Sequence, residues 1–370
     1  METFRRLGFD KTLCLITLIL VAIGIMMVFS SSAYISNEKY HQPFYFLLHQ
    51  ALGAVLGLLL MFAVATIKKP FFQNPIFVLG LLFVTLGLLM LCLLMPTIAR
   101  TNRWIVLFGI RFQPSELAKI SLVLFFSYYL QAKNDRLHEW KTLLIPLAVL
   151  FAVILLVCME PNFSAAMLIT GISVMMLILG GVKWKHFALL GAVLAIFSGL
   201  FLIQADYRVE RIHGFLTPDK DPLGNNYQVI QSKMAVGSGG LLGASFGEST
   251  QKLFFLPFAH TDFIFAILGE EFGLAGTVVS LALFLAFLWR GLAIASRTSN
   301  SSYRLIAAGL TMTIVAQALL NISVVLGLGP PTGIPLPFIS YGRSSLVTNL
   351  AAVGILLNIS GRKGDLGGRV

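Results

Sequence analysis

The sequence predicts an all-α polytopic membrane protein with about ten transmembrane helices, both termini in the cytoplasm and one large, partly helical extracytoplasmic loop. Of the 370 residues, 57% are hydrophobic and only 12% are charged, and the mean hydropathy is +0.86, outside the range of soluble globular proteins. The apolar runs are too long for strands and lack the alternation of a membrane barrel. Basic residues also gather on one side of the predicted membrane.

The apolar runs each approach the roughly 20 residues needed to cross about 30 Å of hydrocarbon. We predict a single domain, residues 1–370, that contains ten of these runs: 12–35, 44–67, 75–95, 113–130, 142–159, 163–182, 186–203, 262–289, 305–328 and 341–359. The first stretch is too long for a secretory signal and has no small-residue cleavage site, so we interpret it as a retained helix.

The formal net charge of +11 reflects topology rather than a nucleic-acid partner. With the N-terminus inside, the segments assigned to the cytoplasm hold most of the Lys and Arg residues. The short exterior loops hold only Lys39, Arg100, Arg103, Arg111 and Arg343. The positive-inside rule therefore predicts a cytoplasmic location for both termini, and we predict no nucleic-acid binding.

One connection, residues 204–261, is long, and by this topology it lies outside. Tyr227–Val236 has an amphipathic helical pattern and precedes the glycine-rich GSGGLLGASFG. We therefore predict a folded lid or re-entrant cap rather than a flexible linker. The glycines allow close approach of the backbone to a ligand, or they merely permit turns, and the sequence leaves both readings open.

Ionisable residues inside or beside the apolar runs are candidate functional groups, because burying charge in a bilayer is costly. Glu116 and Lys119 in QPSELAK are spaced i, i+3 and can pair on one helix face, as a substrate site or as a structural ion pair. Arg100, Arg103 and Arg111 around Trp104 suit lipid phosphates or interface anchoring equally well. Gln317 and Asn321, spaced i, i+4, are more typical of interhelical hydrogen bonds.

The stretch LPFAHTDFIFAILGEEFGL contains four ionisable residues: His260, Asp262, Glu270 and Glu271. Asp262 lies at the predicted exterior mouth, either as an N-terminal helix cap or as a catalytic carboxylate. Before the last run, PPTGIPLPFISYGRSS is a rigid non-helical segment that includes Ser340 and Tyr341. No nucleotide-binding loop or zinc-ligand spacing is present in the sequence.

These motifs resemble those of the SEDS family (shape, elongation, division and sporulation) of bacterial membrane glycosyltransferases, and are closer to its division branch. The resemblance covers nearly the whole chain and rests on NRWI, RFQPSELAK, DPLGNNYQVIQSKMAVGSGGLLG, QKLFFLP, AHTDFIFAILGEE and PPTGIPLPFISYG. It implies polymerisation of lipid II into glycan strands at the outer face of the bacterial cytoplasmic membrane. It also implies a class B penicillin-binding protein as transpeptidase partner, with other divisome or elongasome membrane proteins.

The resemblance also implies residue roles. Asp262 matches the catalytic carboxylate of the family's HTDF motif, and Glu116 and Lys119 match the family's QPSELAK pair. Three positions depart from the family pattern, because Asn162 stands for an aspartate, Phe258 for a glutamate and Arg343 for a glycine. Two customary carboxylates are therefore missing.

A single inverting displacement accounts for converting an α-linked diphosphate donor into a β-linked polymer. In this hypothesis Asp262 is the general base for the acceptor hydroxyl, an effect worth about 10² to 10⁴ in rate. The further candidate substrate-binding residues, several of them cations suited to the departing diphosphate, are Lys119, Glu116, Arg103, Arg111, Lys252, His260, Ser340 and Tyr341. No cofactor is certain, and a divalent cation at the diphosphate stays open. A lipid II flippase and a non-catalytic divisome scaffold are the alternative functions.

Overall fold

A computed structural model describes residues 8–67, 70–95, 102–107, 110–183, 185–187, 191, 226–253 and 255–361. The predicted seventh apolar stretch, 186–203, lies almost entirely outside these residues, as do Arg100 and the first part of the long loop.

Each of the other nine predicted stretches forms a helix. They are α2 (Lys11–Tyr40), α3 (Tyr45–Ala65), α4 (Pro75–Leu94), α5 (Pro114–Ala132), α6 (Trp140–Met159), α7 (Phe163–Leu179), α11 (Ile264–Ser296), α12 (Ser301–Val325) and α13 (Arg343–Ser360). In the described part of the chain, α2, α3, α4, α6, α11 and α12 are long and apolar enough to cross a membrane. The protein is a multi-pass membrane protein, whereas the count of ten spans stays a prediction.

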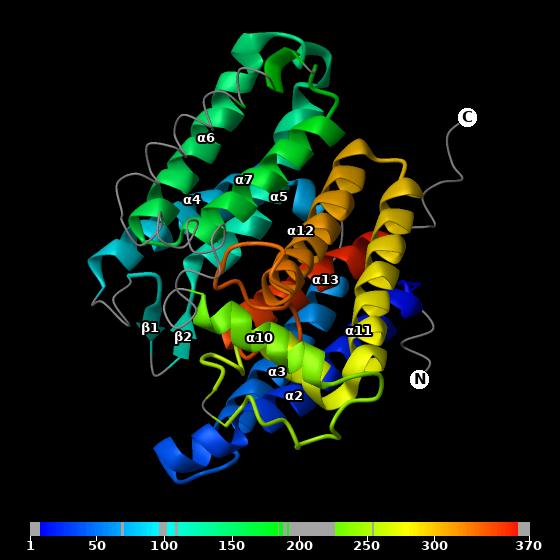
Figure 1. Ribbon diagram of the computed structural model, residues 1–370. Coiled ribbons are helices and arrows are strands. Elements are labelled where there is room, and N and C mark those ends of the chain that lie inside the picture. Colours follow the sequence, from blue (N-terminus) through cyan, green and yellow to red (C-terminus); the bar gives the residue numbers. More distant parts are fainter. Residues whose placement is uncertain are drawn as a thin grey trace.

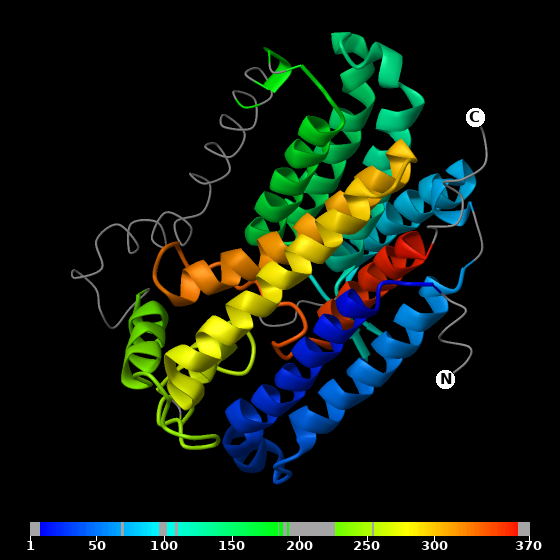
Figure 2. The same cartoon turned by 90° about the vertical axis from the view of Figure 1, so that its right-hand side faces the viewer.

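The helices run side by side in an inclined bundle (Figure 2). α12 lies at its centre, with 78% of its most apolar window buried, against 28% for α3 and α4. The outer helices expose large apolar side chains, among them Ile76, Phe83 and Leu94 of α4. An apolar outer surface of this kind suits hydrocarbon rather than water.

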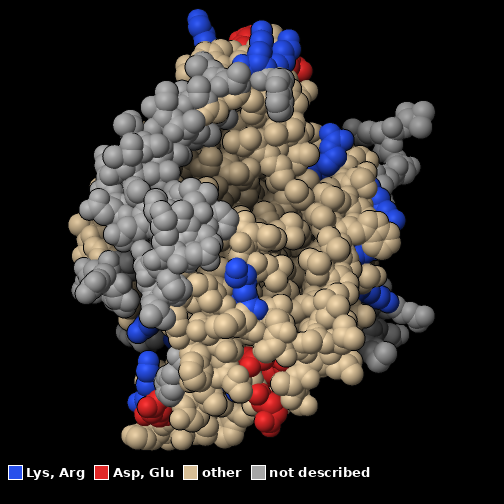
Figure 3. All heavy atoms as spheres, in the orientation of Figure 1, with Lys and Arg blue, Asp and Glu red and all other residues tan. Residues whose placement is uncertain are grey.

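Shorter elements join the helices. A single turn η1 (Phe71–Gln73) precedes α4, and η2 (Asn134–Arg136) lies between α5 and α6. Strands β1 (Ile105–Leu107) and β2 (Ile110–Phe112) pair antiparallel between α4 and α5. Lys and Arg side chains gather over the turn between α5 and α6, at the top of Figure 3, on the side that the sequence assigns to the cytoplasm.

Polar side chains fix where several helices begin. Asp10 accepts a hydrogen bond from the Leu13 backbone at the start of α2, and Asn74 and Asn300 cap α4 and α12 in the same way. Pro114 occupies the first turn of α5, where its missing N–H costs nothing. A Cβ built on Gly8 would lie 3.6 Å from the Gly361 carbonyl, so the two ends of the described chain lie together.

The predicted helix in the long loop is confirmed as α10 (Tyr227–Ser238), which lies across α11 and α12 (Figure 1). The glycine-rich turns after it pack against the backbone of α11. A Cβ on Gly239 would lie 2.0 Å from the Gly269 carbonyl oxygen, and one on Gly243 would lie 2.1 Å from that of Glu271. At these two positions the close approach is therefore to α11.

Candidate active site

The non-helical segment 330–342 holds the backbone of His260 and Thr261 in place. The Ser340 hydroxyl donates to the Thr261 carbonyl at 2.5 Å and accepts from the Leu336 N–H at 2.9 Å. The Tyr341 N–H donates to the His260 carbonyl at 2.9 Å. Ser340 and Tyr341, both predicted site residues, thus fix the backbone that leads to Asp262.

Asp262 lies against this same segment and is partly exposed. Its carboxylate faces Gly333, where an added Cβ would be 3.6 Å from Oδ2. The Asn321 amide donates to the carbonyls of Asp262, at 2.7 Å, and of Ile334, at 2.8 Å. The described structure does not show Asp262 as a helix cap, because α11 begins at Ile264, its N-cap residue is Phe263, and no side chain caps it.

Glu116 and Lys119 form the predicted ion pair, at 2.9 Å between Nζ and Oε1, and both side chains are buried. Lys119 Nζ also donates to Gln317 Oε1 at 2.6 Å. The Gln317 amide in turn donates to the Pro335 carbonyl at 3.0 Å. Gln317 and Asn321, one turn apart on α12, therefore connect the buried cation and the backbone of Asp262 to neighbouring carbonyls of segment 330–342.

His260 lies among aromatic rings, 4.8 Å from Phe46 and 5.8 Å from Tyr341 between ring centroids. Burial, with a smaller contribution from the positive charge of Lys39, lowers the pKa of His260 to about 4. Its Nδ1 is buried with no hydrogen-bond partner among the described residues. At neutral pH this imidazole is therefore neutral.

The guanidinium groups of Arg343 and Arg111 lie near enough to Tyr341 for their positive charges to act on its hydroxyl. The predicted cation Arg111, on β2, is therefore close enough to the site to affect Tyr341. Arg343, which departs from the family pattern, adds a second positive charge beside the same ring.

Arg103 is close to Glu160, a fully buried carboxylate just after α6. Burial raises the pKa of Glu160 to about 8, and the Cys92 thiol and the charge of Arg103 oppose this shift. Asn162 donates to the Ser115 hydroxyl at 3.1 Å. Although Asn162 is no carboxylate, a buried carboxyl group is present two residues earlier.

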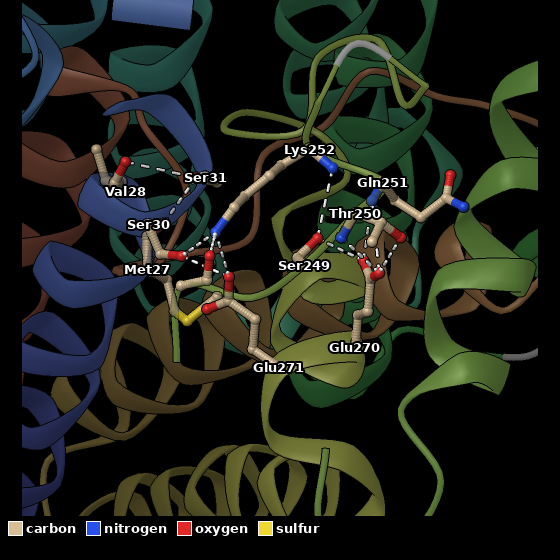
Figure 4. A network of polar contacts seen from close by, with 11 residues as sticks. Met27, Val28, Ser30, Ser31, Ser249, Thr250, Gln251, Lys252, Glu270 and Glu271 are labelled. Carbon is tan, nitrogen blue, oxygen red and sulfur yellow. Dashed lines mark hydrogen bonds and ion pairs between the residues drawn. The ribbon is translucent and has the colours of Figure 1, made fainter. Parts of the chain in front are cut away.

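Lys252 lies in a different set of contacts from the other predicted cations (Figure 4). Its Nζ binds Glu271 Oε1 at 2.8 Å, the Gly247 carbonyl at 2.6 Å and Ser30 Oγ of α2 at 3.1 Å. Ser30 also donates to Glu271, at 2.5 Å. All three ammonium donors are thus occupied, in contrast with the expectation of a cation that receives diphosphate.

Glu270 receives donors from the turn just before Lys252. The Thr250 N–H and hydroxyl each lie 2.9 Å from its Oε1, and the Ser249 hydroxyl donates to its Oε2. Figure 4 shows both glutamates reached from residues 249–252. Glu270 and Glu271 therefore attach the loop to α11, which accounts for two charges that are costly to bury. Their spacing in the sequence did not indicate this role.

The described geometry brings Asp262, His260, Ser340 and Tyr341 together, with Arg111 nearby, and links Glu116 and Lys119 to them through Gln317. It does not bring in Lys252. Sequence reasoning missed Gln50 of α3, whose amide donates to the Ser340 carbonyl at 3.1 Å and accepts from the Gly342 N–H at 3.2 Å. The only sign of Gln50 in the sequence was an amide side chain within an apolar run.

The arrangement can support transfer chemistry at one end of the bundle. A partly exposed carboxylate on a fixed backbone can accept a proton, and a buried ammonium with two of its three donors occupied can still bind an anion. Within the described residues no group of three or more His, Cys, Asp and Glu side chains gathers to hold a metal ion.

Comparison with known proteins gives consistent matches along the chain. Residues 10–364 match the family of FtsW, RodA and SpoVE, described as "Cell cycle protein". The chain is 37% identical to a "Probable peptidoglycan glycosyltransferase FtsW" of Trichlorobacter lovleyi, over 97% of this chain and 95% of that protein. It is 38% identical to "Stage V sporulation protein E" of Bacillus subtilis, over 97% and 98%.

Solved structures resemble the fold as well. A chain from a study titled "Structural coordination of polymerization and crosslinking by a peptidoglycan synthase complex" superposes with a TM-score of 0.79 at 30% identity, covering 95% of this chain and 97% of that one. The rod shape determining protein RodA of Thermus thermophilus gives a TM-score of 0.70 at 25% identity, covering 95% and 96%.

Proposed function

We propose, since the chain belongs to the FtsW, RodA and SpoVE family, that it is a peptidoglycan glycosyltransferase that polymerises lipid II into glycan strands. The observation that carries this proposal is the pair of side chains on α12, Gln317 and Asn321, which tie Lys119 and the backbone of Asp262 to one rigid segment. A base and a cation held on a common support suit a reaction that moves a proton and releases an anion.

In the proposed reaction Asp262 removes the proton from the acceptor sugar hydroxyl as its oxygen attacks the anomeric carbon of the donor. The bond from that carbon to the diphosphate oxygen breaks, the electron pair leaves with the diphosphate, and the configuration inverts. Lys119 offers its third N–H to a phosphate oxygen, while Glu116 and Gln317 hold its orientation. Arg111 and Arg103 are further candidates for the diphosphate charge.

The other predicted site residues take supporting roles. Ser340 and Tyr341 fix the backbone before Asp262, and neutral His260 packs its uncharged ring against Phe46 and Tyr341. We leave Lys252 out of substrate contact because its donors are occupied. A divalent cation, if it assists, would arrive with the diphosphate, and no step here depends on it.

The proposed location is the bacterial cytoplasmic membrane, with Asp262 on its outer face, as the distribution of Lys and Arg residues predicts. The proposed partner is a class B penicillin-binding protein that crosslinks the strands. Support for a partner comes from the structural neighbour, whose title couples polymerization to crosslinking in a complex.

The test is polymerisation of labelled lipid II by the purified chain, with and without its class B partner, resolved by product length. We expect Asp262→Asn to abolish polymer while the protein stays folded, because the amide cannot accept the proton. Glu248→Gln, an exposed carboxylate in the same loop, is the matched control and should polymerise normally.

Three other outcomes would reject the proposal. Lipid II crossing the membrane in both variants would indicate a flippase. Polymer from Asp262→Asn at the unmodified rate would remove the carboxylate from the reaction. Absence of polymer from every folded variant, with the partner present, would favour a scaffold role.

A further inference from the structure

A cavity of about 520 Å³ lies at the other end of α11 from Asp262. Arg290 and Arg297 of its wall are 28 and 35 residues beyond Asp262, about 40 Å or more along a helix that rises 1.5 Å per residue. The rest of the wall comes from the starts of α2 and α12, the end of α13, and Pro70 and Gln73 at η1. This cavity therefore belongs to no part of the site described above.

Positive charge exceeds negative charge in this cavity. Its lining contains three cations, Lys11, Arg290 and Arg297, and one carboxylate, Asp10. Both oxygens of Asp10 are occupied, because Oδ1 accepts the Leu13 N–H and Oδ2 binds Arg290. The carboxylate thus neutralises one of the three cations.

The other two cations, Lys11 and Arg297, have no counter-ion among the described residues. In the described part of the chain, the Arg290 Nε is buried with no hydrogen-bond partner. The Asp10 backbone is fixed in turn by the Ser360 hydroxyl at 2.8 Å. Among the described residues, the lining of the cavity therefore carries two more positive charges than negative charges.

We infer that this cavity binds a phosphate group, and that the group is the headgroup of an anionic phospholipid from the leaflet opposite to Asp262. Guanidinium groups match phosphate oxygens in geometry and charge. The cavity is much larger than one phosphate ion, and it lies at the ends of apolar helices, the part of a membrane protein that meets lipid headgroups. Basic pockets between transmembrane helices at such a surface suit anionic headgroups. The inference does not depend on the proposed enzymatic activity.

The test counts lipids bound to the full-length protein by native mass spectrometry, after reconstitution with phosphatidylglycerol or with phosphatidylcholine. We expect retention of phosphatidylglycerol over phosphatidylcholine, and about tenfold weaker retention in Arg297→Gln, the order expected when one charge-assisted interaction is lost. Arg304→Gln, an exposed arginine on α12 outside the cavity wall, should bind lipid like the unmodified chain.

Two further measurements keep the inference open to refutation. Arg290→Gln leaves Asp10 without its partner and is prone to misfold, so Lys11→Gln serves as the second cavity variant. Inorganic phosphate is added as a competitor. Displacement of the lipid only at phosphate concentrations far above the cellular range supports a lipid site, whereas tight phosphate binding without lipid preference overturns the lipid assignment. Equal lipid retention in all variants overturns the site.

Discussion

The orientation of the buried Lys119 side chain is fixed by its hydrogen-bond partners. A buried ammonium is costly unless its donors are occupied, and here Glu116 and Gln317 take two of them while one Glu116 oxygen has no partner in the described structure. The ion pair was predictable from i, i+3 spacing. Gln317 was not predictable as its third member, because it is 198 residues away in sequence.

We predict that Gln317→Leu reduces polymerisation per folded molecule about 10- to 100-fold and also lowers stability by about 1 to 3 kcal/mol, because Leu fills the space but neither holds Lys119 nor binds the Pro335 carbonyl. Thr313→Val, one turn earlier on α12, removes a hydroxyl that bonds only within its own helix and should be nearly neutral. Polymerisation rate and thermal unfolding in detergent are measured together. Equal rates per folded molecule in the two variants would refute the positioning role.

We also predict that stability falls as pH drops from about 6.5 toward 4 because of His260. The pKa of His260 in the folded protein is about 4, below its usual value of about 6.5. The unfolded chain therefore binds the proton first, and the free energy of unfolding falls as pH drops through this range. The measurement is the midpoint of thermal unfolding against pH. His260→Gln should flatten the curve between these values, whereas exposed His138→Gln should leave it unchanged.

Helix α11 shows the limits of prediction at the scale of elements. Its long apolar sequence predicted a helix, and this helix is present. However, its backbone is not helical at Gly273, where φ is 62° and ψ is −158°. The sequence did not indicate at which glycine α11 would bend. That choice depends on the turns of residues 239–243, whose carbonyls and amides fill the space beside Gly273.

We predict that Gly273→Ala destabilises the protein strongly, by about 1 to 3 kcal/mol for backbone strain before any steric clash. An added Cβ would lie 2.5 Å from the Gly243 nitrogen and 2.7 Å from the Leu241 carbonyl. Gly171→Ala in α7, where nothing lies within 4 Å of an added Cβ, is the control. Detergent unfolding curves compare the two, and equal midpoints would contradict the strained bend.

Across the described part of the molecule, two of the groups of buried charged side chains lie at the predicted outer end and hold chain segments in place. One group fastens the loop through Glu270, Glu271 and Lys252, and the other joins Lys119 and Asp262 to segment 330–342. The apolar runs and breaks predicted the helices and the rigid segment, because those features are local. Which charge meets which partner was not predictable, since Ser30 and Glu271 are 241 residues apart.

The central claim is tested most directly by comparing polymerisation rates of the unmodified chain and Asp262→Asn at equal lipid II occupancy, each with its class B partner. Occupancy is measured by direct binding of labelled lipid II. We predict binding within about threefold of the unmodified chain and polymerisation reduced by about 10² or more, the range of general-base assistance. Equal rates at equal occupancy would contradict the account.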